Sequence, residues 1–520
     1  MNQHSVETRK HLLRIQRQIY KDLKEEVDRT IGKSRGPLAR AFHDYERLLR
    51  RFEKRVPLEE VLDKLPQCDI LYLGDYHTLL QSQKTALRIL KEIVAKGRKV
   101  SLAIELVHWK NQPLLEAYLR EELPEKEFLD AIGYPVTFPF NWTHYKPIFE
   151  FAKAESLPIY GINFTAQTTQ NSLRSRDQKG AQALTQLISK HPEDLFFVLY
   201  GDIHLRKGGL PEMAQKILKK NGVRKRSLIL YQNSETLYWK LARLGIENKT
   251  EAVRLSQNRY CLMNSTPWVK LQSYLLWLEH GEDLLCTHNN EQDPEEHPHS
   301  AFDYSHEIAE LAQRITEFLK LPPVNLESFE VHTMEDLRFL DRYASLRKWE
   351  IRRWILHSKS CYLPEKRIIY LARLDVNHAA EEAAEFIHHS LSNYSVRDYL
   401  KPPYFFHRAW RKALGFFGSK LINPRRKIPT IPKGSPLQEI TDHYQRLWNT
   451  NQSRQDCGQE DRRYYFEISK HLGYILGEKL FQSVSRGKIP LEEMVSLFRK
   501  PFVDPSLSER QFRHWLLLSL

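Results

Sequence analysis

The chain has 520 residues, of which 41% are hydrophobic and 28% are charged. This composition excludes a disordered chain and a single small domain, and it predicts two or three globular domains with apolar cores. Lysine and arginine exceed aspartate and glutamate by 79 to 65, a formal charge of +14. A basic balance permits contact with nucleic acid, anionic lipid or an acidic ligand and does not choose among them. The five cysteines are scattered without a CxxC pair, which argues against a disulfide framework and against a zinc ribbon.

The N-terminal segment, residues 1–58, is predicted to be helical. Residues 5–30 read as a charged amphipathic helix and lack the apolar stretch of a signal peptide. No apolar run in the chain is long enough to span a bilayer. From these two absences we predict a cytoplasmic location without a transmembrane segment.

Between residues 59 and 286, apolar β-type runs alternate with helix-like stretches. The runs cover residues 69–74, 101–107, 157–163, 195–201 and 226–232. Near-continuous apolar strands separated by helices predict an α/β domain with a mixed, largely parallel sheet covered by helices on both faces. The polar, acidic and proline-containing residues 287–300 predict a linker. Residues 301–520 have a mostly helical pattern and predict a mainly helical C-terminal domain.

Two of the predicted strands end in the same four-residue motif. One strand runs into Gly74-Asp75-Tyr76-His77, and the other runs into Gly201-Asp202-Ile203-His204. A glycine at a strand end allows the backbone to turn or a ligand to approach closely. In extended backbone, an aspartate and a histidine two residues apart project to the same side. We therefore expect the aspartate and the histidine of each motif to share one environment.

A third strand, Val100 to Ile104, ends at Glu105. An acid that follows a buried strand is costly to bury unless it is paired or coordinated. Ligands of open α/β sheets bind beyond the carboxyl ends of the strands, so we predict one site that combines His77, Glu105 and His204. Two imidazoles and a carboxylate suit a divalent metal ion such as zinc, iron or manganese.

The aspartates of the two motifs leave alternatives open. Asp75 and Asp202 could ligate the metal themselves, or they could orient the neighbouring imidazoles. Asp75 could instead cap a helix predicted over residues 78–97.

Four longer segments carry a family resemblance. They read LGDYHTLLQSQ, AIELVHWKNQPLLEAYL, EKEFLDAIGYPVTFPFNWTHYKPIFEFAKAESLPIYGIN and FFVLYGDIHLRKGGLPEMAQ. Their content and order resemble the ChaN-like haem-binding domain of the Tiki/erythromycin-esterase superfamily. The resemblance covers about residues 60–285, and residues 301–520 resemble no family that we recognise.

The resemblance implies a bacterial protein that binds haem or a divalent metal ion at the strand ends, in iron or haem handling. On the family pattern His77, Glu105 and His204 would hold the metal, with Asp202 beside them. Candidate haem contacts are the aromatic and imidazole side chains near the site, namely Tyr76, His108, Trp109, Trp142, His144 and Tyr145. The chain lacks the lipoprotein signal common among ChaN proteins, which argues against haem uptake at the cell surface.

Two other functions stay open at this point. The wider superfamily includes metal-dependent proteases and esterase-like hydrolases, so the chain could be a metal-dependent hydrolase. Glu105 or Asp75 would then accept the proton of a metal-bound water. Alternatively, the α/β domain is a scaffold and the helical half is an interaction module. The sequence also leaves open whether the protein forms a homodimer.

Two features of the C-terminal region invite a functional interpretation. His378, Glu382, Glu385 and His389 fall on one helical stripe, which we interpret as a solvated polar face in preference to a metal site. Residues 401–433 hold nine lysines and arginines, no acids, and interleaved aromatic residues. This pattern favours contact with a membrane surface over contact with nucleic acid, and a basic loop packed by its aromatic side chains explains it equally well.

Overall fold

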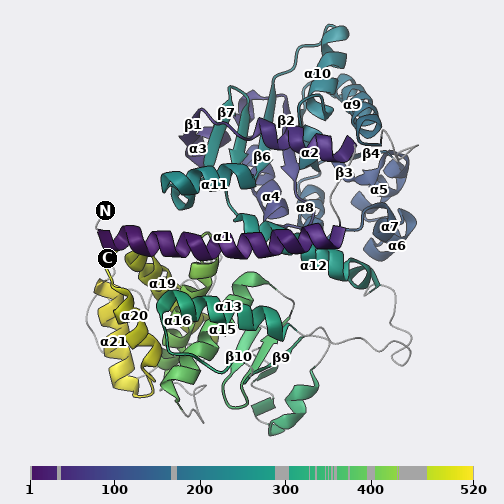
Figure 1. The fold of residues 1–520 in the computed structure, drawn as a ribbon. Coiled ribbons are helices and arrows are strands. Elements are labelled where there is room, and N and C mark those ends of the chain that lie inside the picture. Colours follow the sequence, from purple (N-terminus) through teal and green to yellow (C-terminus); the bar gives the residue numbers. More distant parts are fainter. Residues whose placement is uncertain are drawn as a thin grey trace. The chain divides into compact units, whose positions relative to one another are not determined.

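The chain divides into two compact units in the computed structural model (Figure 1). One unit comprises residues Met1–Ile19 and Glu295–Leu520, and the other comprises Tyr20–Pro294. The structure describes residues 3–31, 37–164, 172–286, 304–326, 328–333, 337–345, 347–348, 351–352, 355, 360–372, 375–394, 404–429, 431 and 465–518. The predicted linker, 287–300, lies outside the described residues.

The unit Tyr20–Pro294 contains an eight-stranded sheet. Its strands are β1 (Lys54–Val56), β2 (Ile70–Asp75), β3 (Val100–His108), β4 (Ile159–Asn163), β5 (Leu195–Gly201), β6 (Ser227–Gln232), β7 (Ala252–Ser256) and β8 (Arg259–Leu262). Their order is β1-β7-β8-β6-β2-β5-β3-β4. All pairs from β8 to β4 are parallel, whereas β7 pairs antiparallel with both β8 and β1. The sheet is therefore mixed and largely parallel, as predicted.

Helices cover both faces of this sheet. The α-helices that lie within this unit are α2 (Pro37–Leu48), α3 (Leu58–Leu62), α4 (Leu80–Ala95), α5 (Gln112–Leu119), α6 (Glu125–Ala131), α7 (Tyr134–Thr137), α8 (Trp142–Ala154), α9 (Ser172–Lys190), α10 (Leu210–Lys220), α11 (Glu235–Leu244) and α12 (Pro267–Cys286). Helix α1 (Gln3–Ile31) begins in the other unit and belongs to this one from Tyr20 onward. Leu71 and Leu73 of β2 pack in one cluster with Ile89 of α4 and Phe149 of α8. Tyr72, between the two leucines, is fully buried on the other face.

The connections bring three strand ends to one edge of the sheet. β2 and β5 are parallel, with Gly74 opposite Tyr200 and Asp75 opposite Gly201. β3 pairs in parallel with β5 on its other side. This confirms the predicted arrangement of the three strands, with β2 and β5 parallel and β3 beside β5. The strand predicted to end at Glu105 instead continues to His108, and its pairing with β5 ends at Ile104, just before Glu105.

The other unit is mainly helical. Its helices include α13 (Ser305–Leu319), α15 (Val376–Ser392), α16 (Phe405–Ile422), α19 (Tyr465–Ser485), α20 (Leu491–Arg499) and α21 (Pro505–Leu518). A three-stranded sheet of order β10-β11-β9 accompanies them, formed by β9 (Glu330–His332), β10 (Ser360–Leu363) and β11 (Ile368–Leu371). The sequence analysis did not predict these short strands. A fully buried strand of four residues has no alternation of apolar and polar residues, so its sequence cannot be distinguished from that of a buried helix segment.

The basic aromatic segment of this unit is largely interior. Helix α16 places Phe405, Trp410, Phe416 and Phe417 in the core. Three of the aromatic residues that suggested membrane anchors, Phe405, Phe416 and Phe417, are therefore core residues, and Phe406 is half-buried. Residues 401–403, 430 and 432–433 lie outside the described part of the chain. Among the described residues, no helix combines the length and the apolarity that crossing a bilayer requires.

The polar stripe of α15 is interior too, so our preference for a solvated face was wrong. Glu381, Glu382 and Glu385 are fully buried. The Lys412 ammonium lies 3.0, 3.4 and 2.5 Å from these three carboxylates, respectively. Buried charges persist when they are paired, and the basic residues of α16 supply the partners. The lysine occupies the position among the acids that a bound cation would take.

Candidate functional site

Asp75, the last residue of β2, is the centre of a buried hydrogen-bond group. Its Oδ2 accepts from the Tyr145 hydroxyl at 2.6 Å and lies 2.9 Å from His77 Nδ1. Its Oδ1 accepts from Gln83 Nε2 at 2.5 Å. Helix α4 begins after Leu79 and has no side-chain cap. Asp75 is therefore not a helix cap, and it orients the imidazole of His77.

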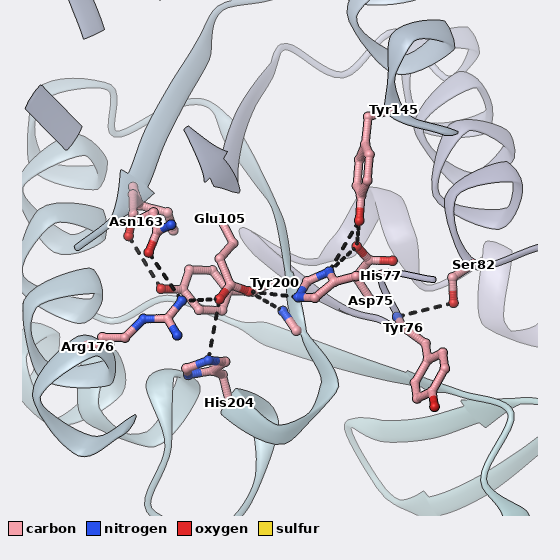
Figure 2. Close-up of polar contacts among 12 residues, drawn as sticks. Asp75, Tyr76, His77, Ser82, Glu105, Tyr145, Asn163, Arg176, Tyr200 and His204 are labelled. Carbon is pink, nitrogen blue, oxygen red and sulfur yellow. Dashed lines mark hydrogen bonds and ion pairs between the residues drawn. The ribbon is translucent and has the colours of Figure 1, made fainter. Parts of the chain in front are cut away.

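His77 lies in the turn after β2 and reaches toward the end of β3 (Figure 2). Its ring packs against both Phe138 and Phe140, with centroid separations of 4.9 and 4.6 Å. Its Nε2 lies 3.7 Å from Glu105 Oε2. Burial lowers the pKa of His77, but the hydrogen bond and charge of Asp75 and the charge of Glu105 outweigh it and raise the pKa overall.

Glu105 lies between two histidines and is only 4% exposed. Its Oε2 accepts from the Gly201 N–H at 2.7 Å, and its Oε1 lies 3.4 Å from His204 Nε2. Arg176 of α9 also donates to Oε1. Burial raises the pKa of Glu105, but the charges of His204, His77 and Arg176 and the Gly201 hydrogen bond lower it overall. Glu105 is thus held as a carboxylate.

His204 has a carboxylate partner on helix α9. Its Nδ1 lies 2.5 Å from Asp177 Oδ1, and Asp177 Oδ2 pairs with Arg206 Nη1 at 2.8 Å. Asp177 is fully buried and His204 is 3% exposed. Each imidazole of the site therefore has an aspartate on Nδ1 and directs Nε2 toward Glu105.

The second motif departs from the geometry expected of it. Asp202 and His204 belong to a short 3₁₀ turn, Asp202–Leu205, so the alternation of extended backbone ends at Gly201. Asp202 lies on the Gly74 side, where its Oδ1 is 2.0 Å from the position of a Cβ built on Gly74. Burial raises the pKa of Asp202 to about 6. The structure does not bring this carboxyl to His204.

Gly201 leaves an atom-sized space in the middle of the group. A Cβ built on it would lie 3.1 Å from Glu105 Oε2, 3.1 Å from His77 Nε2 and 3.5 Å from His204 Cδ2. The backbone of Gly201 has φ −53° and ψ 136°, which any residue adopts. The turn therefore does not require a glycine. Because Gly201 has no side chain, the space among His77, Glu105 and His204 is left free of a Cβ atom.

The candidate haem contacts are spread around the site. Tyr76 points away from Glu105 (Figure 2) and has Lys270 Nζ 4.3 Å from its ring centroid. His108, the last residue of β3, and Trp109, which follows it, pack on Phe164. His144 lies in the first turn of α8, next to Tyr145. Of these, Tyr145 joins the site directly, through Asp75.

The cavity beside the site is small. It has a volume of about 10 Å³ and is lined by Asp75, His77, Glu105, Tyr145 and six apolar residues, Ile104, Leu106, Phe138, Ile148, Phe149 and Leu199. This is about the space of one water molecule. The pocket has room for an ion or a water and no room for a macrocycle.

Sequence reasoning missed Asp177 and Arg176, which contact His204 and Glu105. Both lie in the first two turns of helix α9. Neither follows a strand, so the strand-end argument could not find them. The charged run Arg174-Ser175-Arg176-Asp177 was their one signal, and such runs are ordinary on solvated helices.

Comparison with known proteins gives one family match. The family described as "Haem-binding uptake, Tiki superfamily, ChaN" matches residues 61–175. This confirms the predicted resemblance for that part of the chain and leaves the C-terminal half unmatched. The matched region contains His77 and Glu105 and ends before Asp177 and His204. No curated protein matches the chain.

Two solved structures resemble the chain weakly. One is described as "Cofacial heme binding to ChaN of Campylobacter jejuni", with 14% identity and a TM-score of 0.28, covering 35% of this chain and 87% of that one. The other is "The structure of the type III effector HopBA1", with 15% identity and a TM-score of 0.26, covering 35% and 85%. Scores this low support no conclusion about a ligand.

Proposed function

We propose that the α/β unit is a ChaN-like haem- or metal-binding module with its ligand at the carboxyl ends of β2, β3 and β5. The form that the geometry supports best is a divalent metal ion on His77, Glu105 and His204. The main support for this metal site is the space beside Gly201, which the side chains of His77, Glu105 and His204 surround.

The donor set fits a metal ion chemically. Asp75 and Asp177 hold the two Nδ1 atoms, so each neutral ring would offer its Nε2 lone pair toward Glu105. Carboxylates on the outer nitrogen are the usual support for histidines that bind metal. Two histidines and one glutamate suit zinc, with a position left for water or substrate.

The structure also shows what metal binding would have to change. In the described residues the ligand atoms of His77, Glu105 and His204 do not all lie within 4.8 Å of one another. Arg176 already neutralises one oxygen of Glu105. A metal ion would therefore draw the side chains inward and compete with the guanidinium for the carboxylate.

Haem fits the small pocket beside His77 and Glu105 poorly. The space is that of one water, and the free Nε2 of His77 faces Glu105 rather than solvent. Haem stays in the proposal because of the family match, and it would have to lie outside this pocket.

Two titrations of the full chain, after treatment with a chelator, test the proposal. Calorimetry with Zn²⁺ should show one site that is lost in His77→Ala and in His204→Ala. Titration with haem should leave the Soret band as it is in buffer. A shifted Soret band without a zinc site would favour haem instead, and failure of both titrations would refute the module.

Hydrolysis is a second candidate, favoured by the partial exposure of His77, whose side chain is 19% exposed. A bound divalent ion supplies a water of lowered pKa. Glu105, whose carboxylate faces the space at Gly201, would accept the proton, because Asp75 already holds Tyr145, Gln83 and His77. Zinc-dependent cleavage of p-nitrophenyl acetate that disappears in Glu105→Gln would support this activity, and equal rates in both proteins would exclude it.

A further inference from the structure

The two imidazoles of the site are held in matching ways from different elements. His77 takes its carboxylate from its own strand end, two residues away. His204 takes its carboxylate from Asp177, on the helix that connects β4 to β5. In both cases the aspartate contacts Nδ1, and Nε2 faces the same glutamate.

Asp177 has no freedom to serve His204 in another way. Its Oδ1 contacts His204, and its Oδ2 lies in an ion pair with the Arg206 guanidinium at 2.8 Å without the geometry of a hydrogen bond. Arg206 is anchored in turn, because its Nη1 donates to the Ile203 carbonyl at 3.0 Å. A carboxylate can only accept hydrogen bonds, so the neutral imidazole must carry its proton on Nδ1. Its Nε2 lone pair then faces Glu105 and the space at Gly201.

We propose that Asp177 is a positioning residue that fixes the tautomer of His204 and thereby makes its Nε2 a ligand. This inference rests on the proposed metal site and adds a residue that neither the strand-end motifs nor the matched family region contains. Of the two aspartates that orient the histidines, Asp177 comes from helix α9 and Asp75 from strand β2.

The substitution Asp177→Asn separates this role from a structural one. An asparagine keeps the shape and hydrogen-bonding capacity of the side chain. The Arg206 guanidinium donates only, so it selects the amide oxygen and turns the NH₂ group toward His204. The amide then donates to Nδ1, the ring proton moves to Nε2, and the lone pair no longer faces the site.

The experiment compares the full chain with Asp177→Asn and a matched control, Asp194→Asn. Asp194 is equally buried, accepts from Ser101 Oγ at 2.6 Å and pairs with Lys99 at 3.0 Å. It precedes β5 and so lies at the opposite edge of the sheet. Zn²⁺ affinity is measured by calorimetry, and the His204 tautomer is read from ¹⁵N shifts of histidine-labelled, metal-free protein, with His204→Ala for assignment.

We expect Asp177→Asn to weaken Zn²⁺ binding by about 10- to 100-fold, the usual effect of losing such a partner, and Asp194→Asn to leave it unchanged. In the unaltered protein His204 should carry its proton on Nδ1. Unchanged zinc affinity in folded Asp177→Asn overturns the positioning role while the metal site stands. Absence of zinc binding in the unaltered protein refutes the proposed function instead. A proton on Nε2 in the unaltered protein overturns the positioning role even where Asp177→Asn fails to fold.

Discussion

Replacing Gly201 with alanine adds one methyl group at the point that His77, Glu105 and His204 share. The backbone there already suits alanine, so the change reduces the entropy of the unfolded chain and stabilises by about 0.4–1 kcal/mol. Against this stand two contacts of 3.1 Å, and overpacking of this kind costs about 1–3 kcal/mol. The net loss of free energy of unfolding should stay below about 2.6 kcal/mol, and the unit should fold.

Binding should suffer far more than folding. A ligand that draws the three side chains inward must push them against the new methyl group. A strain of about 1–3 kcal/mol on binding corresponds to a loss of affinity of about 5- to 150-fold. Calorimetry with Zn²⁺ measures this loss, and circular dichroism checks that the variant folds.

Gly180→Ala in helix α9 is the matched control for this substitution. A Cβ there would meet Leu210 Cδ1 at 3.3 Å and Tyr200 hydroxyl at 3.6 Å, a similar crowding that adds no atom among the three ligands. We expect zinc affinity to be unchanged in Gly180→Ala. Equal affinity in Gly201→Ala and the unaltered protein would show that the ligand does not use the space at Gly201.

Four further outcomes are expected. His77→Ala and His204→Ala should each abolish Zn²⁺ binding with little loss of stability, since a preorganised polar site usually costs stability; unfolding of either variant with affinity kept in its folded fraction would make that histidine structural. Because the fold raises the pKa of His77 above its ordinary 6.5, protons compete with zinc, and calorimetry across pH should show affinity falling as pH drops through the raised value. Because folding raises the pKa of His77, protonated His77 contributes to the stability of the fold, and this contribution is complete below pH 6.5. The contribution is lost as the pH rises through the raised pKa of His77. If the protein instead became more stable over this rise in pH, the assignment of His77 would be contradicted. Lys412→Met should destabilise the helical unit by about 3–5 kcal/mol, because it leaves three buried carboxylates without their ammonium. Chemical denaturation measures this loss, and calorimetry on the same variant should show unchanged zinc affinity. Unchanged stability would mean that the carboxylates are not charged.

The strand-end part of the site could be predicted because its signals are local. An apolar run followed by Gly-Asp-x-His or by Glu105 predicts both a buried strand and the polar group at or near its carboxyl end. A parallel sheet then brings these polar groups to the same edge. His77 follows from that reasoning directly, whereas Glu105 lies inside β3, which continues to His108. His204 follows as well, although its turn is 3₁₀ rather than extended.

The partners across the fold could not be predicted in the same way. Asp177 reaches His204 only because helix α9 packs beside the end of β5, a contact between residues 27 positions apart. The i and i+2 rule pointed to Asp202 instead, and it failed because the chain leaves the strand at Gly201. On α15, the pattern could not distinguish a solvated stripe from a buried one, because the deciding residues, Arg411 and Lys412, lie on another helix.

Anomalous diffraction from crystals of the full chain grown with Zn²⁺ tests the central claim most directly. We expect one strong peak at the carboxyl ends of β2 and β5, about 2.0–2.2 Å from His77 Nε2, His204 Nε2 and a Glu105 oxygen. The proposed metal site would be contradicted if the density showed Arg176 still paired with Glu105 and no anomalous peak between the two imidazoles.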